Sequence, residues 1–410
     1  MYDFDEIVDR HGTGCVKFDA ECVPAGTLPM WVADMDFKTP DFIVDALKER
    51  LEHPVLGYSL MPDDYFGVIA SWVRSLHGWN VLPSQIRYIP GIVKGIGMVI
   101  NAFLRPGDKV IIQPPVYHPF RFVPQKSGCE VIYNPLVELP EGGYRMDFDQ
   151  LESIIDADTR LLILSNPHNP AGICWDRKTL ETLAEITSRR GVMVISDEIH
   201  CEMLLPSCPG EESPKHIPYA SVSDAAASNS ITFMAPSKTF NIAGVVTSYA
   251  IVLNPMLREK FFNYLDAGEL DSPNLFSTIA TMAAYGKGAQ WRREMLDYVR
   301  GNVDFVCGFL AERMPSGPDG GPLVRCVRPQ ASFLVWMDFR SLGLPQTELV
   351  KLLESAGVYM NDGSIFGSIM PDGTPVGHEG DGFMRLNVGC PRSVVAEAME
   401  RIRAAVQSLF

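Results

Sequence analysis

The sequence predicts an α/β protein with a large domain built on a mostly parallel sheet and a smaller α+β domain. Its 410 residues are more than one core usually supports, so two domains are expected. In the first two thirds of the chain, short β-rich runs alternate with helical patterns, an order typical of a parallel sheet covered by helices on both faces. After about Ala284 this alternation stops, which marks the change to the second domain.

The β-rich runs of the large domain are short, and each is bounded by Pro, Gly, Asn or Asp, the residues that commonly flank strands. They cover residues 109–113, 160–164, 191–196, 230–234 and 245–253. Apolar residues also recur with the period of a helix in three segments, two before these strands and one between them. These helical segments are 41–53, 65–77 and 179–190. Residues 46–285 are therefore assigned to the large domain.

The rest of the chain predicts a different arrangement. A long helix leads into the turn-rich SGPDGGP and is followed by a strand, a helix, a second strand and a last helix, at 289–313, 332–338, 347–356, 382–388 and 394–409. Residues 286–410 are therefore predicted to form the small domain, with a surface loop at 370–380. The start of the chain is irregular, and we expect the segment 1–45 to pack with the small domain.

Composition and charge exclude several classes of protein. Hydrophobic residues make up 46% and charged residues 21%, which is ordinary for a soluble globular protein. The formal net charge of −15 disfavours nucleic acid and anionic membranes as partners. The acidic N-terminus is unlike a signal peptide and no apolar run is long enough to span a bilayer, so a cytoplasmic location is expected. The nine cysteines include no CxxC pair, and the sequence indicates no metal site.

One lysine stands directly after a strand that is predicted to be buried. Lys238 lies in the segment APSKTFN, which follows the β-rich run 230–234. Strand ends in α/β sheets face the ligand crevice, whereas most lysines are solvated surface charges. Lys238 is thus a candidate catalytic residue.

Three further motifs occupy comparable positions. The apolar run 191–196 ends in SDEIH, and acidic residues such as Asp197 at strand ends serve as caps, metal ligands or general bases. SNPHNPAG follows the run 160–164, where a proline-rich turn is the simplest interpretation. PGIVKG opens a helix, and backbone N–H groups at a helix start can hold a phosphate. The sequence contains neither the dinucleotide-binding nor the P-loop fingerprint.

The ordered set of motifs is more specific than any one of them. In chain order the set is GIV, PVYHPF, NPHNPAG, SDEIH, SKTFN and FMRLNVGCPR. It resembles the fold-type I enzymes that use pyridoxal 5′-phosphate (PLP), the class I/II aminotransferase superfamily. The opening MYDFDEIVDRHGTGCVKFD, ADMDF at 33–37 and GYS at 57–59 are similar to its MalY/PatB-type branch of cystathionine β-lyases and cysteine-S-conjugate β-lyases. The resemblance spans essentially the whole chain.

The resemblance implies PLP as the cofactor and assigns roles to named residues. Lys238 would hold PLP as a Schiff base and, once freed, would remove the Cα proton of the substrate. Asp197 would pair with the pyridine nitrogen and keep the ring protonated. Arg385 would bind the substrate α-carboxylate through two hydrogen bonds. The other implied PLP contacts are the backbone at Gly91, Ile92 and Val93 and the Ser237 hydroxyl at the phosphate, Tyr117 on the ring face, Asn169 at the phenolic oxygen, and Tyr58 at the phosphate from the other subunit of a homodimer.

Two positions depart from the aminotransferase pattern. Ala235 stands where aminotransferases commonly have the first serine of S-x-S-K, so one hydroxyl contact to the phosphate is missing. His200 stands where they commonly have tyrosine, three residues after the ring-pairing aspartate, as in the lyase branch. His200 could hydrogen-bond the phenolic oxygen of PLP or could pack beneath the site.

The resemblance implies that the protein is a PLP-dependent carbon–sulfur β-lyase. It would cleave cystathionine, cysteine or another S-substituted cysteine to a thiol, pyruvate and ammonia. Two alternatives stay open: an aminotransferase of the same fold, and a regulatory or binding protein with a structural PLP site. The presence of Lys238, Asp197 and Arg385 together disfavours the non-catalytic alternative, and the sequence shows no appended DNA-binding module.

Overall fold

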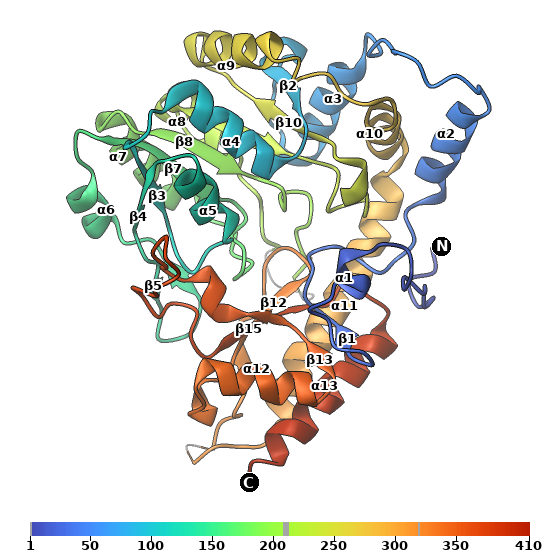
Figure 1. The fold of residues 1–410 in the computed structure, drawn as a ribbon, viewed down its shortest axis with the longest axis vertical. Coiled ribbons are helices and arrows are strands. Elements are labelled where there is room, and N and C mark those ends of the chain that lie inside the picture. Colours follow the sequence, from blue (N-terminus) through green and yellow to red (C-terminus); the bar gives the residue numbers. More distant parts are fainter. Residues whose placement is uncertain (1, 208–212, 319) are drawn as a thin grey trace.

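The computed structural model describes residues 2–207, 213–318 and 320–410. A seven-stranded sheet forms the centre of the larger half of the protein (Figure 1). The strand order is β2-β10-β9-β8-β7-β3-β4. Of the described pairings in this sheet, β10 is antiparallel to both of its neighbours, β2 and β9, and the others are parallel, so the predicted mostly parallel sheet is confirmed. The strands are β2 (Ile86–Ile89), β3 (Lys109–Ile112), β4 (Glu130–Tyr133), β7 (Thr159–Ser165), β8 (Met193–Asp197), β9 (Ser230–Met234) and β10 (Ser248–Ile251).

Helices cover both faces of this sheet because its inner strands are apolar on both sides. On β7, Leu161 and Ile163 point into one core, and Leu162 and Leu164 point into the other. The first core is closed by α4 (Ile92–Phe103), α5 (Pro119–Lys126) and α9 (Pro255–Ala267). The second is closed by α6 (Phe148–Ile154), α7 (Arg177–Arg189) and α8 (Asp224–Asn229).

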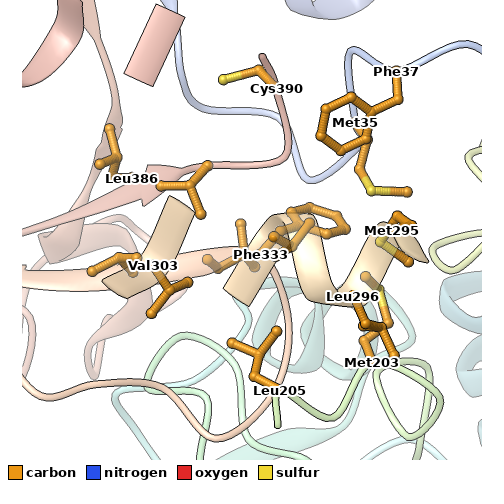
Figure 2. Close-up of a cluster of buried hydrophobic side chains, with 14 of the residues drawn as sticks. Met35, Phe37, Met203, Leu205, Met295, Leu296, Val303, Phe333, Leu386 and Cys390 are labelled. Atoms are coloured by element: carbon orange, nitrogen blue, oxygen red, sulfur yellow. The ribbon is translucent and has the colours of Figure 1, made fainter. Parts of the chain in front are cut away.

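A second, four-stranded antiparallel sheet forms the smaller half, as the predicted α+β domain requires. Its strands, in order, are β11 (Arg325–Cys326), β12 (Leu334–Asp338), β15 (Phe383–Asn387) and β14 (Asn361–Asp362). The long helix α11 (Ala289–Arg313) packs against it, and Figure 2 shows Val303 of this helix beside Leu386 and Phe333. The remaining helices here are α12 (Gln346–Ser355) and α13 (Arg392–Gln407).

The N-terminal segment joins the smaller half. Its strand β1 (Leu28–Pro29) pairs in parallel with β13 (Val358–Tyr359), and Met35 and Phe37 enter the core shown in Figure 2. These contacts agree with the expected packing of the segment, while the domain boundaries at 45 and 285 stay a prediction. The other helices and short strands are α1 (Val16–Asp19), α2 (Asp41–Leu51), α3 (Tyr65–His77), α10 (Leu275–Lys287), β5 (Val137–Glu138) and β6 (Tyr144–Arg145).

The predicted run 245–253 is shorter as a strand than the sequence suggests. Its beginning forms a 3-10 turn, Ala243–Val245, and Val246 has a φ of 59°, so regular pairing starts only at Ser248. Residues 370–380 form no helix and are mostly exposed, as expected for a surface loop. Among the residues that the structure describes, no helix combines the length and the apolar character needed to cross a bilayer.

Candidate active site

The predicted site residues converge on one cavity of about 330 Å³. It lies at the carboxyl ends of the parallel strands, because β7 and β8 end at Ser165 and Asp197 and both residues line it. Of the predicted residues, those lining the cavity are Gly91, Ile92, Val93, Tyr117, Asn169, Asp197, His200, Ser237 and Lys238.

Lys238 follows β9 and points into this cavity. Its Nζ donates a hydrogen bond to the backbone oxygen of Ala33, at 2.5 Å. Burial lowers the pKa of Lys238 to about 8, against the opposing effect of the nearby Asp34 and Asp197 carboxylates. A lysine with this pKa carries a substantial neutral fraction near neutral pH, which is what a nucleophile or a general base requires.

Asp197 is a buried carboxyl group that also faces the cavity. Its Oδ1 accepts a hydrogen bond from the backbone N–H of Ile199, and burial raises the pKa of Asp197 to about 7. Such a group is stabilised in its ionised form by a cation beside it, and a protonated pyridine nitrogen fits that need. The adjacent Glu198 is engaged elsewhere, at 2.7 Å from Nε2 of His216, so it stays out of the chemistry.

The start of α4 provides a site for a phosphate. Gly91 precedes the helix with a φ of 104°, a conformation that side chains other than glycine rarely adopt. Within the described part of the chain, no side chain caps this first turn, which leaves the N–H groups of Ile92 and Val93 available to an anion. Ser237 lines the same cavity and can add a hydroxyl donor. These residues fit the phosphate of PLP.

Arg385 comes from β15 of the smaller half and is 4% exposed. Its Nη1 donates to Oδ1 of Asn169 at 3.0 Å, and its Nη2 donates to the backbone oxygen of Trp31 and to Oδ1 of Asn361. Its Nε has no hydrogen-bond partner among the residues described. The hydrogen bond from Nη1 of Arg385 occupies Oδ1 of Asn169 and leaves the amide Nδ2 of Asn169 as a donor. The pair therefore fits a substrate carboxylate at Arg385 and the phenolic oxygen of PLP at Asn169.

His200 and Tyr117 complete the cavity wall. His200 packs edge-on to Phe333 with ring centroids 6.4 Å apart, and burial lowers its pKa to about 3, so the imidazole is neutral. A neutral imidazole has one donor nitrogen and one acceptor nitrogen. His200 thus packs against Phe333 and lines the cavity as a neutral imidazole, while its hydrogen bond to the phenolic oxygen of PLP stays a prediction.

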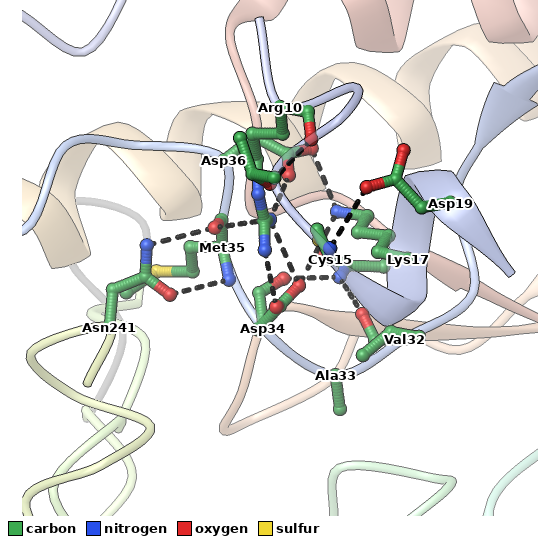
Figure 3. Close-up of polar contacts among 12 residues, drawn as sticks. Arg10, Cys15, Lys17, Asp19, Val32, Ala33, Asp34, Met35, Asp36 and Asn241 are labelled. Carbon is green, nitrogen blue, oxygen red and sulfur yellow. Dashed lines mark hydrogen bonds and ion pairs between the residues drawn. The ribbon is translucent and has the colours of Figure 1, made fainter. Parts of the chain in front are cut away.

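Four charged side chains hold the chain segment that passes over Lys238, and Figure 3 shows them together. Arg10 contacts Asp34 at 2.7 Å and Asp36 at 2.6 Å, and the fully buried Lys17 contacts Asp36 at 2.7 Å. We refer to Arg10, Lys17, Asp34 and Asp36 as the acidic clasp. It fixes the ADMDF segment whose first residue, Ala33, supplies the backbone oxygen bound by Lys238.

Asn241 ties the same segment to the loop that carries Lys238. Its Nδ2 donates to the backbone oxygen of Met35 at 2.8 Å, and its Oδ1 accepts from the N–H of Met35 (Figure 3). Its Nδ2 also donates to the backbone oxygen of Phe37 at 2.8 Å. The sequence placed Asn241 in the SKTFN motif without a role. It also gave no role to Asn361, which reaches Arg385 because the two residues lie opposite each other in the β14–β15 pairing. That register has no signal in the sequence.

Tyr58 is the one predicted site residue that the structure places well away from the cavity. It is fully exposed in the extended connection between α2 and α3, which loops out from the body of the protein (Figure 1). Val55, Leu56 and Leu60 on the same connection are also largely exposed. A role for Tyr58 in the site of the same chain is therefore not supported.

Comparison with known proteins agrees with this geometry. Residues 32–402 match the family described as aminotransferase class I and II. The chain is 40% identical to the cystathionine β-lyase PatB of Bacillus subtilis, over 98% of this chain and 99% of PatB, and 32% identical to the protein MalY of Escherichia coli over the full length of both. The structure of the PLP-bound C–S lyase of Staphylococcus hominis superposes with a TM-score of 0.85 at 31% identity, over 99% of both chains. The chain therefore belongs to the class I and II aminotransferase family of fold-type I enzymes and, within it, to the MalY/PatB-type branch.

Proposed function

We propose that this protein is a PLP-dependent carbon–sulfur β-lyase that acts on cystathionine or another S-substituted cysteine. The observation that carries the proposal is the meeting of Lys238, Asp197 and the Asn169–Arg385 pair around one cavity, in a chain of the MalY/PatB-type branch. The products would be a thiol, pyruvate and ammonia. We also propose the cytoplasm as the location of the enzyme.

Arg385, Lys238 and Asp197 each have a separate role in this reaction. Arg385 binds the α-carboxylate through two N–H groups and so orients the Cα–H bond of the substrate. PLP, when bound, supplies the conjugated ring that accepts the electron pair left at Cα. Lys238 takes up the Cα proton, since burial leaves its amine partly neutral near physiological pH. Asp197 stabilises the positive charge on the pyridine nitrogen, and the cavity wall limits the access of water.

The choice between lyase and aminotransferase depends on what happens after the Cα proton is lost. A thiolate leaves Cβ readily because a cysteine-like thiol has a pKa of about 8.5. An aminotransferase would instead return the proton to the cofactor. Here the neutral His200 stands at the position where aminotransferases commonly have tyrosine, which supports the lyase reaction.

The decisive assay supplies cystathionine to the purified holoenzyme without any keto acid and measures pyruvate and ammonia over time. Steady formation of both is expected, and Lys238→Ala should abolish it together with the visible absorption band of bound PLP. Alanine with 2-oxoglutarate is the matched transamination assay and should give at most slow turnover. If turnover requires a keto acid and yields a new amino acid in equal amount, the protein is an aminotransferase.

We also propose that the enzyme is a homodimer with shared sites. The exposed Tyr58 and its apolar neighbours Val55, Leu56 and Leu60 support this, because an exposed apolar segment is typical of an interface. Tyr58 would then reach the PLP phosphate of the other subunit. Mixing the Tyr58→Phe and Lys238→Ala proteins under conditions of subunit exchange should create one native site per heterodimer and restore part of the activity. Verified exchange without recovered activity would argue against shared sites.

A further inference from the structure

Two thiols lie next to each other in the smaller half of the protein. Sγ of Cys307, on α11, is 3.5 Å from Sγ of Cys326, on the edge strand β11. Both side chains are half-buried, and neither takes part in the site described above. A disulfide requires an S–S distance of about 2.0 Å, so the two sulfur atoms need to approach by only about 1.5 Å.

The surrounding contacts already hold these two elements in place. Arg328, two residues after Cys326, donates from Nε to Oδ1 of Asp304 at 2.7 Å, and Asp304 lies one helical turn before Cys307. On its other side, β11 pairs with β12 through Cys326 and Met337. The Arg328–Asp304 contact therefore holds the strand side against the helix next to the thiols, and the pairing with β12 holds β11 in the sheet.

We propose that Cys307 and Cys326 form a redox-active dithiol that a low-molecular-weight disulfide converts into an intramolecular disulfide. In the first step the thiolate of Cys307 attacks the small disulfide, forms a mixed disulfide and releases one thiol. In the second step the thiolate of Cys326 attacks the sulfur of Cys307 and releases the second thiol. Two protein thiols and one small disulfide thus give one protein disulfide and two small thiols, and excess thiol reverses the reaction.

The reactivity of the two thiols supports this order. The hydrogen bond with the Cys326 thiol lowers the pKa of Cys307, and the positive charge of Arg328 acts in the same direction, although burial opposes both. Cys326 lines a second cavity, of about 340 Å³, next to Arg325, Arg328 and Tyr144. The cavity gives access to Cys326, and Sγ of Cys307 lies 3.5 Å from the sulfur of Cys326.

The test treats the full-length holoenzyme with oxidised glutathione, blocks the remaining thiols by alkylation and maps the peptides by mass spectrometry. The expected product is a cross-linked pair of peptides containing Cys307 and Cys326, lighter by two hydrogen atoms than the reduced pair and restored by dithiothreitol. The exposed Cys22 serves as an internal reference that the oxidant was effective. Cross-linked protein should melt about 3 °C higher than the reduced protein, because the bond closes a short loop of chain.

Matched cysteine variants make the result specific. Cys307→Ser should lose the cross-link, whereas Cys174→Ser, which removes another half-buried thiol, should keep it. Modification of Cys22 while both Cys307 and Cys326 remain free to be alkylated would overturn the proposal. Pairing of either residue with a different cysteine, or a lower melting temperature after cross-linking, would overturn it as well.

Discussion

Removing Asp36 from the acidic clasp should cost more free energy of unfolding than removing Lys17. Asp36 is 8% exposed and holds two cations, Arg10 at 2.6 Å and Lys17 at 2.7 Å. Among the residues that the structure describes, the one further ion-pair partner of Lys17 is Asp34, at 3.9 Å. Asp36→Asn leaves the fully buried Lys17 ammonium with that one distant carboxylate. Breaking a buried pair from one side costs about 3–5 kcal/mol, and Asp34 brings the expected loss to about 3 kcal/mol. Lys17→Met leaves Asp36 bound to Arg10 and should cost about 1 kcal/mol.

Urea unfolding followed by tryptophan fluorescence measures these differences in the free energy of unfolding. Trp31 reports on this region directly, because its Nε1 donates a hydrogen bond to the backbone oxygen of Lys17. Adding Lys17→Met to Asp36→Asn should recover part of the lost stability, because it removes the cation that was left unpaired. Equal losses for the two single variants, or a further loss in the double variant, would refute the reasoning.

Three further predictions concern the active site. Burial lowers the pKa of Lys238 to about 8, so its reactive neutral form predominates above that pH and is lost below it. The rate at which apoenzyme takes up PLP should therefore rise with pH with a midpoint near 8, and a midpoint near 10 would contradict the burial of Lys238. Asp197→Ala should keep the circular-dichroism spectrum but lower kcat about 10³-fold, and near-normal turnover would mean that another group pairs with the pyridine nitrogen. Arg385→Lys should lower kcat/KM about 10²-fold through the loss of one charge-assisted hydrogen bond and the planar geometry, whereas an unchanged value would place the substrate carboxylate elsewhere.

The sequence could predict the parts of the site that follow strands. Lys238, Asp197 and Asn169 each come directly after an apolar run, and parallel strands bring such positions to one edge of a sheet. It could not place the partners of Arg385, because Trp31 and Asn361 reach it through pairings between segments that are distant in the chain. Local patterns carry no information on that register.

The N-terminal segment shows a different limit of prediction. Lys17 reads as a surface residue, yet it is fully buried, because Asp34 and Asp36 neutralise its charge. Short strands were also missed: β2 and β4 lie at the two edges of the sheet, and their apolar residues are interrupted by Arg87 in β2 and preceded by the exposed Glu130 in β4. Residue type and periodicity alone do not reveal a buried lysine or an edge strand.

The segment from Trp31 to Ala33 links Arg385 to Lys238. The backbone oxygen of Trp31 accepts a hydrogen bond from Arg385, and the backbone oxygen of Ala33, two residues later, accepts one from Lys238. Two peptide units therefore separate the main-chain acceptor of Arg385 from that of Lys238, so the positions of the guanidinium and of the amine both depend on the same three-residue stretch of main chain.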